Sequence, residues 1–291
     1  MAVNGNENLS DSMTLDEALR APGAPIVVFD KVWLAFDDLV VLRNVSFTLI
    51  MGHTKIIMGA SGAGKSTILK LLLGLLKPDS GVIWVGGERV DQMRERELMR
   101  VRADIGMVFQ EGALFDSLTV GENVGYKLYE ETALPLDEVR KRVEEVLGFV
   151  GLADYIDRMP SELSGGQRRS VAIARAMAAK PRLLLYDEPT TGLDPMTATT
   201  VDDEIIKLRD LENVSSILVT HQLRDAFYVA THTALRDNGN LRFVPASGNK
   251  SEEAEFIMLR DGAICFEGTA DQLRRAPDPY LRTFLGDDWC Q

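Results

Sequence analysis

A glycine-rich stretch of the chain has the residue types and spacing needed to hold a polyphosphate. Residues 59–66 read GASGAGKS and directly follow the apolar residues 56–58. Glycine lets the backbone curl so that successive N–H groups point at one anion. In such a loop Lys65 supplies charge for the outer phosphates, and Ser66 supplies a hydroxyl for Mg²⁺. The alternative, a turn that binds nothing, is disfavoured because a strand and a helix, expected over residues 66–76, flank the loop.

Two adjacent carboxylates follow an apolar strand. Residues 183–188 read LLLYDE, and the carboxyl end of a parallel strand is where side chains meet a ligand. Asp187 is predicted to hold Mg²⁺ through water, and Glu188 is predicted to orient or deprotonate an attacking water. The alternative is a pair of solvated surface acids. It is disfavoured because burying a strand that runs straight into two acids is costly unless they have a role.

Two further segments are candidates for contact with an anion. Residues 163–167 read LSGGQ, where Ser164 suits a helix N-cap and Gly165 and Gly166 leave N–H groups open at the helix start. An ordinary capped helix explains this segment equally well. His221 ends an expected strand, which is predicted to lie beside the strand of Glu188, so that its ring reaches a γ-phosphate. A purely structural histidine is the more common alternative.

Strands that alternate with helices must position these side chains, which predicts an α/β fold with a mostly parallel sheet. The segment around residues 112–178 is predicted to be a helical insertion into this fold, and the polar residues 236–255 a solvated hairpin or loop. Asp261 and Gly262 predict a hairpin turn. The polar, mixed-charge residues 90–101 are expected to form either a surface helix or a loop. The expected strands are 26–34, 45–49, 55–58, 82–85, 105–109, 183–186 and 216–220, and the other expected helices are 136–150, 167–179 and 196–211.

Composition narrows the classes of function. The net charge of −12 disfavours binding to nucleic acid. The two cysteines, Cys265 and Cys290, have neither metal-ligand nor redox spacing, which fits a reducing cytosol. No apolar stretch reaches the roughly 18 residues of a membrane span, and no signal peptide is expected.

Taken in order, the motifs resemble those of ATP-binding-cassette (ABC) ATPases. The motifs are GASGAGKS, Gln110, LSGGQ, LLLYDEP, the Gly-Leu-Asp at 192–194 and His221. This resemblance implies a P-loop NTPase nucleotide-binding domain over residues 25–286, with an antiparallel β subdomain and a helical subdomain at about 112–178. The polar composition of residues 1–24, rich in Asn, Ser, Gly and Pro, predicts a mobile tail with one short helix around residues 15–19. Residues 287–291 are expected to be a C-terminal tail.

The resemblance also implies a homodimer. Two subunits would lie head to tail, with ATP between the phosphate loop of one and the LSGGQ of the other. The γ-phosphate would bridge both faces and close the dimer, and its hydrolysis would remove that bridge. One chain would therefore carry two anion sites because they serve different ATP molecules.

The resemblance implies individual roles as well. Phe36, at a place where tyrosine is usual, would stack on adenine. Gln110 would touch Mg²⁺ or the attacking water and report the nucleotide state to a membrane partner. Asp194 would link the two active sites across the dimer. The implied catalytic residues are Glu188, His221, Gln110 and Lys65, and the implied Mg²⁺ ligands are Ser66, Gln110 and Asp187. The remaining implied nucleotide contacts are Gly59, Ala60, Ser61, Gly62, Ala63, Gly64, Thr67, Ser164, Gly165, Gly166 and Gln167.

Several local strings are similar to the cassettes of MCE/Mla-type lipid transporters. They are residues 109–128, 159–167, 192–205 and 276–286, whereas the polar segment 236–255 is longer than usual there. This similarity implies separate membrane permease subunits, an MCE-domain lipid-binding component and a peripheral place on the cytoplasmic face of the bacterial inner membrane. Residues 112–126 would receive a coupling helix of the permease, with apolar contacts from Ala113, Leu114, Phe115 and Leu118. Packing of the helical insertion explains the same four residues equally well.

Other functions compete with this one. A cassette for another cargo, imported or exported, has the same motifs. Non-transport ABC ATPases of translation or DNA repair usually carry two cassettes or a long coiled coil, and this chain has neither. A non-hydrolytic switch would be expected to lack Glu188 or His221, and both are present. Cargo and transport direction are not encoded in these motifs.

Overall fold

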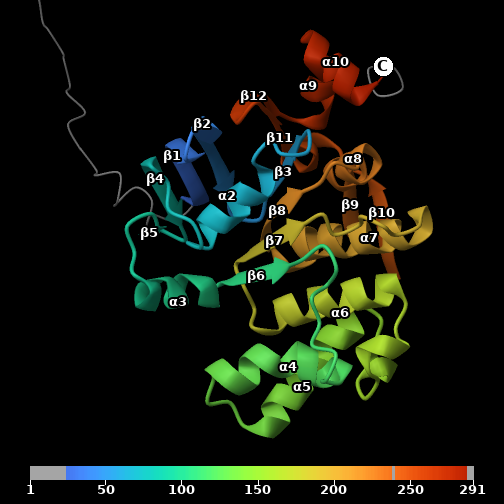
Figure 1. Cartoon of the computed structure of the whole chain (residues 1–291). Helices are drawn as coiled ribbons and strands as arrows, with labels where there is room; N and C mark the ends of the chain where they lie inside the picture. The colour runs from blue at the N-terminus through green and yellow to red at the C-terminus, as the bar shows by residue number, and fades with distance from the viewer. Residues whose placement is uncertain (1–23, 238–239, 287–291) are drawn as a thin grey trace, which may run out of the picture.

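A six-stranded sheet forms the centre of the molecule, with its strands in the order β12-β11-β3-β8-β7-β6 (Figure 1). The computed structural model describes residues 24–237 and 240–286. β12 is antiparallel to β11, and the other neighbouring pairs are parallel, which confirms the predicted α/β fold with a mostly parallel sheet. The strands are β3 (Thr54–Gly59), β6 (Ile105–Val108), β7 (Leu183–Asp187), β8 (Ser215–Val219), β11 (Ala254–Arg260) and β12 (Ala263–Gly268).

The central strands are buried on both faces, and their sequences show why. β3 and β8 are buried along their whole length, and β7 is buried until it reaches Asp187. Successive side chains point to opposite faces of a sheet. Accordingly Tyr186 and Leu218 belong to one hydrophobic core and Leu185 and Ile217 to the other. Covered faces explain the continuous apolar runs in these strands.

An antiparallel sheet packs on one side of this centre, in the order β2-β1-β4-β5. Its strands are β1 (Pro25–Phe36), β2 (Leu39–Ile50), β4 (Ser80–Val85) and β5 (Glu88–Arg89). Asp37, with φ of 51°, forms the turn between β1 and β2. Phe29 and Phe47 stack across that pair at a centroid distance of 4.6 Å. The core beneath them also includes apolar residues of α2 (Lys65–Leu72), so this sheet fixes the helix that follows the phosphate loop.

The helical insertion is a bundle on the opposite side of the central sheet (Figure 1). Val139, Val143, Val146 and Leu147 form the buried face of α5, as their helical spacing predicts. They share one core with α6 and with one face of the sheet. The insertion consists of α4 (Val120–Glu131), α5 (Leu136–Phe149), η1 (Ala153–Tyr155), η2 (Pro160–Glu162) and α6 (Gly165–Ala178).

The remaining helices cover the sheet and lead to the C-terminal region. α7 and α8 pack against each other and contribute apolar residues to the same core as the helical insertion. The remaining helices are α3 (Glu95–Ala103), α7 (Pro195–Glu212), α8 (Leu223–Thr231), η3 (Gly248–Glu252), α9 (Ala270–Arg274) and α10 (Pro279–Leu285). In residues 24–237 and 240–286, none of the helices combines the length and hydropathy that crossing a bilayer would require.

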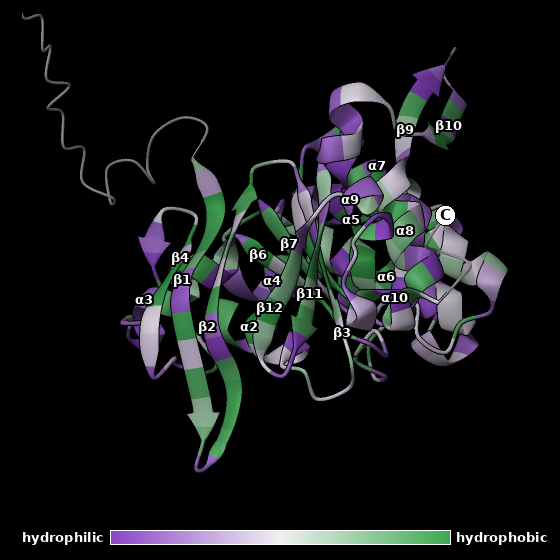
Figure 2. Ribbon diagram, turned by 90° about the horizontal axis from the view of Figure 1, so that it is seen from above, coloured by the Kyte–Doolittle hydropathy of each residue, from purple (hydrophilic) through white to green (hydrophobic). Residues whose placement is uncertain are grey.

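The polar segment after α8 is a hairpin, β9 (His232–Asp237) and β10 (Asn240–Pro245), that projects beyond α7 (Figure 2). The predicted bounds of 236–255 need correction at both ends. The first strand already begins at His232, and Ala254 and Glu255 belong to β11, because they pair in parallel with β3. The hairpin turn predicted at Asp261 and Gly262 is confirmed, because β11 and β12 pair in antiparallel fashion on either side of it.

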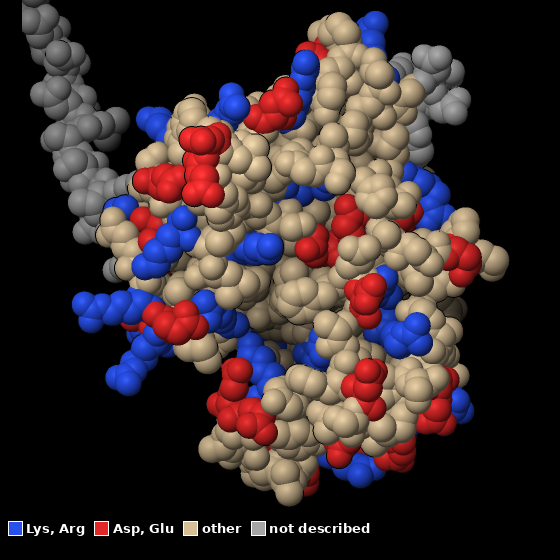
Figure 3. All heavy atoms as spheres, in the orientation of Figure 1, with Lys and Arg blue, Asp and Glu red and all other residues tan. Residues whose placement is uncertain are grey.

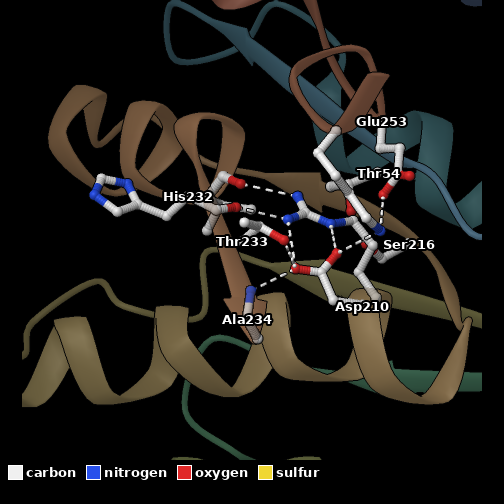
Figure 4. Close-up of polar contacts among 10 residues, drawn as sticks. Thr54, Asp210, Ser216, His232, Thr233, Ala234 and Glu253 are labelled. Carbon is white, nitrogen blue, oxygen red and sulfur yellow. Dashed lines mark hydrogen bonds and ion pairs between the residues drawn. The ribbon is translucent and has the colours of Figure 1, made fainter. Parts of the chain in front are cut away.

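A buried ion pair anchors this hairpin to α7 (Figure 4). The side chains of Arg209 and Asp210 are each 1 % exposed, and Arg209 Nε lies 2.8 Å from an oxygen of Asp210. Asp210 also accepts hydrogen bonds from the Thr233 hydroxyl at 2.8 Å and from the Ala234 N–H at 2.7 Å. Arg209 donates to the carbonyl oxygen of His232 at 2.7 Å. The start of β9 is therefore held by charge-assisted hydrogen bonds rather than by apolar packing alone.

Some predicted boundaries differ from the structure. α2 ends at Leu72 rather than at residue 76, because Gly74 adopts a left-handed conformation (φ 64°) that terminates the helix. Residues 90–101, for which a surface helix and a loop are both expected, include the start of α3, and this helix begins only at Glu95. The predicted tails of residues 1–23 and 287–291, and the short helix around residues 15–19, lie outside the described residues.

Candidate functional site

The predicted phosphate loop and the predicted catalytic residues meet at one edge of the central sheet. A pocket of about 580 Å³ lies there. β3, β6, β7 and β8 are parallel, so their carboxyl ends reach the same edge, and the predicted site residues follow directly after those ends. The pocket is lined by Gly59, Ala60, Ser61, Lys65, Gln110, Glu188, His221, Leu223 and Phe284.

The loop has the curled backbone that its glycines predict. Gly62 and Gly64 have φ of 81° and 97°, and a Cβ on Gly59 would lie 2.4 Å from the carbonyl oxygen of Leu259. Lys65 begins α2 and donates from Nζ to the carbonyl oxygens of Gly59 (2.9 Å) and Ala60 (3.0 Å). Burial lowers the pKa of Lys65, while the charges of Glu188 and Asp187 oppose that shift. The ammonium is thus held against the loop, where an anion would be a better partner than two carbonyls.

The loop is joined to the strand that carries the carboxylates. The Ser66 hydroxyl donates to Oδ1 of Asp187 at 3.0 Å. Burial raises the pKa of Asp187, the hydrogen bond from Ser66 lowers it, and the nearby charge of Glu188 raises it again. A cation beside these oxygens would favour the ionised form.

Glu188 and His221 are in direct contact. Asp187 and Val219 pair on the adjacent strands β7 and β8, as the sequence predicts. His221 Nδ1 consequently lies 2.8 Å from Oε2 of Glu188. The His221 side chain is 51 % exposed and that of Glu188 is 14 % exposed, so the imidazole faces the open pocket while the carboxylate lies at its floor. This placement puts the imidazole beside Glu188 at the pocket, and the reach of His221 to a γ-phosphate stays a prediction.

The LSGGQ segment lies elsewhere in the subunit. Ser164 caps α6: its hydroxyl accepts from the Gln167 N–H at 3.2 Å, and its own N–H donates to Gln167 Oε1 at 2.9 Å. A Cβ on Gly166 would lie 2.1 Å from a methyl of Thr197, so α7 requires this glycine. Among the described residues, 163–167 are not part of the pocket around Lys65. The capped-helix interpretation is therefore correct for the single subunit, and it leaves a role toward a second subunit open.

Asp194 has a local role that the motif did not predict. It is the N-cap of α7, and its Oδ1 accepts from the N–H groups of Met196 and Thr197, each at 3.1 Å. Hydrogen bonds from Thr197 hold the pKa of Asp194 below its usual range. The sequence Asp-Pro before a helix contains this signal, since aspartate is a favoured N-cap and proline a favoured first residue.

Two other predicted contacts, Phe36 and Thr67, are not among the residues that line the pocket. Phe36, at the end of β1, is 47 % exposed, so its ring is open to a flat ligand. Thr67 is half-buried in the first turn of α2, beside Ser66. Sequence reasoning missed Thr191 and Arg169, which contact the Glu188 turn; nothing in the motifs singles out either residue.

The surface predicted to receive a permease is only partly apolar and exposed. Phe115 and Tyr126 are 43 % and 40 % exposed, and their rings lie 4.6 Å apart between centroids. Asn123 is fully buried beneath them and exchanges hydrogen bonds with the backbone of Phe115. Leu114, in contrast, packs against the core. Packing of the helical insertion therefore accounts for Leu114, whereas the exposed ring of Phe115 remains available to a partner.

Comparison with known proteins establishes the class. Residues 42–191, just over half of the chain, match the family model described as "ABC transporter". The chain belongs to this family, as an ATP-binding and ATP-hydrolysing cassette. Cassettes of the family dimerise and pair with membrane permeases. The fold of this chain is similar to that of the ATP-binding cassette MJ0796, solved as a dimer in a post-hydrolysis state with ADP and phosphate. That likeness has a TM-score of 0.68 and 31 % identity, and it covers 84 % of this chain and 98 % of the other.

Three curated relatives show how far the likeness extends. TRIGALACTOSYLDIACYLGLYCEROL 3 of Arabidopsis thaliana is 41 % identical over 289 residues, covering 94 % of this chain and 76 % of the relative. The intermembrane phospholipid transport system ATP-binding protein MlaF of Escherichia coli is 36 % identical, covering 84 % and 82 %. A methionine import ATP-binding protein of Carboxydothermus hydrogenoformans is 41 % identical over 198 residues, and this chain spans 58 % of its length. Similarity thus extends to cassettes named for different cargos.

Proposed function

We propose that this chain powers a lipid transporter of MCE/Mla type, as a head-to-tail homodimer that hydrolyses ATP with Mg²⁺. The observation that carries the proposal is the convergence of Lys65 and the Glu188–His221 contact on one pocket. The Ser66–Asp187 contact joins the residues that directly follow Lys65 and directly precede Glu188 in the sequence. These groups provide phosphate charge, oxygen ligands and a base with its partner, which are the parts that phosphoryl transfer to water requires.

The pocket binds the triphosphate through the loop and Lys65. On binding, Nζ of Lys65 exchanges the carbonyl oxygens of Gly59 and Ala60 for phosphate oxygens, and Phe36 stacks on the adenine. The N–H groups of the loop and the positive end of α2 add to this attraction. The contacts from the same subunit are Gly59, Ala60, Ser61, Gly62, Ala63, Gly64, Lys65, Ser66 and Thr67. Those from the second subunit are Ser164, Gly165, Gly166, Gln167 and Asp194.

The donors near the phosphates fit Mg²⁺. The Ser66 hydroxyl, the Asp187 carboxylate and the Gln110 amide offer oxygen ligands, which Mg²⁺ prefers. Ser66 and Asp187 already converge within 3.0 Å. In residues 24–237 and 240–286, no group of three or more His, Cys, Asp or Glu residues is placed to bind a metal. That fits a metal held by few protein ligands together with substrate phosphates and water. When bound, Mg²⁺ neutralises charge on the phosphates.

Glu188 then accepts a proton from water. The water oxygen forms a bond to the γ-phosphorus while the bond from that phosphorus to the β–γ bridging oxygen breaks. The bridging electron pair leaves with ADP, and inorganic phosphate is the second product. When both of its ring nitrogens carry a proton, His221 orients Glu188 through Nδ1 and donates to the γ-phosphate from Nε2. Gln110 orients the water. Loss of the γ-phosphate removes the bridge between the subunits, so the dimer opens and the permease changes state.

The lipid cargo is supported by similarity over most of the chain to MlaF, which is named for phospholipid transport. On this basis the partners are permease subunits and an MCE-domain component, and the complex lies on the cytoplasmic face of the bacterial inner membrane. Another transported cargo is the second candidate, since relatives are also named for import of methionine and of Fe(3+) ions. Nucleic acid is not a proposed partner. On the face seen in Figure 3, acidic and basic side chains are interspersed rather than gathered by sign.

Two measurements test the proposal. Phosphate release by the purified chain should require Mg²⁺ and should fall at least about a hundredfold in Glu188→Gln, which still binds ATP and dimerises. With its permease in proteoliposomes, the complex should move fluorescent phospholipid and leave methionine outside. Absence of ATP hydrolysis rejects the enzyme. Hydrolysis coupled to methionine uptake alone rejects the lipid cargo and keeps the cassette.

A further inference from the structure

We propose that Thr191 and Arg169 are positioning residues for Glu188, and that they leave Oε1 of that carboxylate to accept the proton of the attacking water. The proposal rests on the proposed function of Glu188. It concerns how the carboxylate is held, and neither Thr191 nor Arg169 touches the substrate.

Three hydrogen bonds hold the other oxygen of Glu188. Oε2 accepts from the Thr191 hydroxyl at 3.0 Å, from His221 Nδ1 at 2.8 Å and from the His221 N–H at 3.3 Å. Among the described residues, no hydrogen bond reaches Oε1. A carboxylate oxygen has about two lone pairs, so three donors saturate Oε2. The proton from water therefore goes to Oε1.

The backbone fixes the same geometry. Glu188 has φ of 52°, in the left-handed region that non-glycine residues rarely adopt. Its N–H donates to the carbonyl oxygen of Val219 at 2.8 Å, and the Thr191 N–H donates to the carbonyl oxygen of Glu188 at 3.3 Å. These bonds form a tight turn that places the Thr191 hydroxyl over the carboxylate. Thr191 is β-branched, so its side chain has few rotamers to lose.

Arg169 supports the turn from α6. Its side chain is nearly buried, at 7 % exposed, and it donates from Nη2 to the carbonyl oxygen of Thr191 at 3.1 Å. A hydrogen bond from a buried charged donor is among the stronger ones in proteins. Arg169 lies two residues after Gln167 on α6, so the helix that begins at LSGGQ is bonded directly to the turn that carries Glu188.

Thr191→Val tests the hydroxyl because valine keeps the branched shape and removes the donor. We expect kcat to fall by about tenfold while KM for ATP stays within about twofold, since the hydroxyl acts on Glu188 and not on the bound nucleotide. Thr191→Ser should restore most of kcat. Thr132→Val is the matched control, because that exposed hydroxyl donates to the Leu128 carbonyl oxygen at the end of α4. It should leave kcat unchanged.

A double-mutant cycle separates positioning from a general structural effect. In a Glu188→Gln background, Thr191→Val should lower the residual rate no further, and Arg169→Met alone should lower kcat by about threefold with unchanged ATP binding. Thermal unfolding of each variant, with and without ATP, confirms that the fold is intact. Wild-type kcat in Thr191→Val or in Arg169→Met overturns the proposal, as does a further loss in the Glu188→Gln background. A wild-type chain that does not hydrolyse ATP instead rejects the proposed function.

Discussion

The hydroxyl of Ser66 and the carboxylate of Asp187 lie 3.0 Å apart although 121 residues separate them in the sequence. The phosphate loop and the strand with the two acids are therefore one structural unit before any ligand arrives. The bond closes the space between α2 and β7, and it brings two oxygen ligands to the place where the phosphates are proposed to lie.

Asp187→Asn should lower Mg²⁺-dependent phosphate release by more than about a hundredfold, because an amide is a weaker ligand for Mg²⁺ than a carboxylate. The variant should bind ATP without Mg²⁺ as the wild type does, measured with a fluorescent ATP analogue. Lys77→Ala, an exposed change just beyond the end of α2 and outside the pocket lining, is the control for local damage. Equal Mg²⁺ dependence in Asp187→Asn and the wild type would contradict the assignment.

Glu204 should make the free energy of unfolding depend on pH. Burial raises the pKa of Glu204 from 4.5 to about 8, against a hydrogen bond from Ser170. The folded state therefore keeps a proton that the unfolded chain releases. The stabilisation is complete below pH 4.5 and is lost as pH rises to about 8. The slope approaches about 1.4 kcal/mol per pH unit for a single proton.

Glu204→Gln should remove the part of the slope that Glu204 contributes, because the amide does not titrate and Oε1 can still accept from Ser170. Chemical denaturation across pH 5 to 8.5 measures it. Asp202, whose pKa burial raises to about 9, remains in the variant and accounts for the slope that is left. An unaltered pH dependence would show that Glu204 is ionised in the folded protein.

Gly166→Ala should destabilise the fold by about 1–3 kcal/mol, the usual cost of overpacking, because its Cβ would overlap a Thr197 methyl at 2.1 Å. Thr197→Ser in the same chain removes that methyl and keeps the hydroxyl that bonds Asp194. It should restore stability in thermal unfolding. If ATPase activity stays low in the stable double variant, Gly166 has a separate role toward the nucleotide of the second subunit.

Asp210→Asn should cost about 3–5 kcal/mol of unfolding free energy, because it leaves the buried guanidinium of Arg209 without its charge partner. Asp237→Asn, which breaks an exposed pair with Arg242 on the same hairpin, should cost under about 1 kcal/mol. Urea denaturation compares the two. Similar costs would mean that the buried pair does not anchor the hairpin.

Phe115→Asp should prevent co-purification of the permease while ATP affinity is unchanged, because a charged group on the exposed ring position opposes apolar docking. Leu114→Asp serves as the contrast. It should lower thermal stability, since Leu114 packs on the core. Normal permease capture by Phe115→Asp would place the docking surface elsewhere.

Local sequence was sufficient wherever one short segment defines the geometry. The glycines predict the loop around Lys65, and the apolar run before Asp187 predicts a buried strand that ends at the pocket. Contacts between distant segments were not predictable in this way. The bond from Arg169 to Thr191 depends on how α6 packs beside the Glu188 turn, which no local pattern encodes. The end of α2 was misplaced because the apolar residues beyond Gly74 continue the helical pattern even though the backbone does not.

The attachment of β9 and β10 through Asp210 lies outside the residues that line the nucleotide pocket. The anchor of this accessory element therefore shares no residue with the walls of the nucleotide pocket, so a change in the length of the hairpin should leave those walls in place.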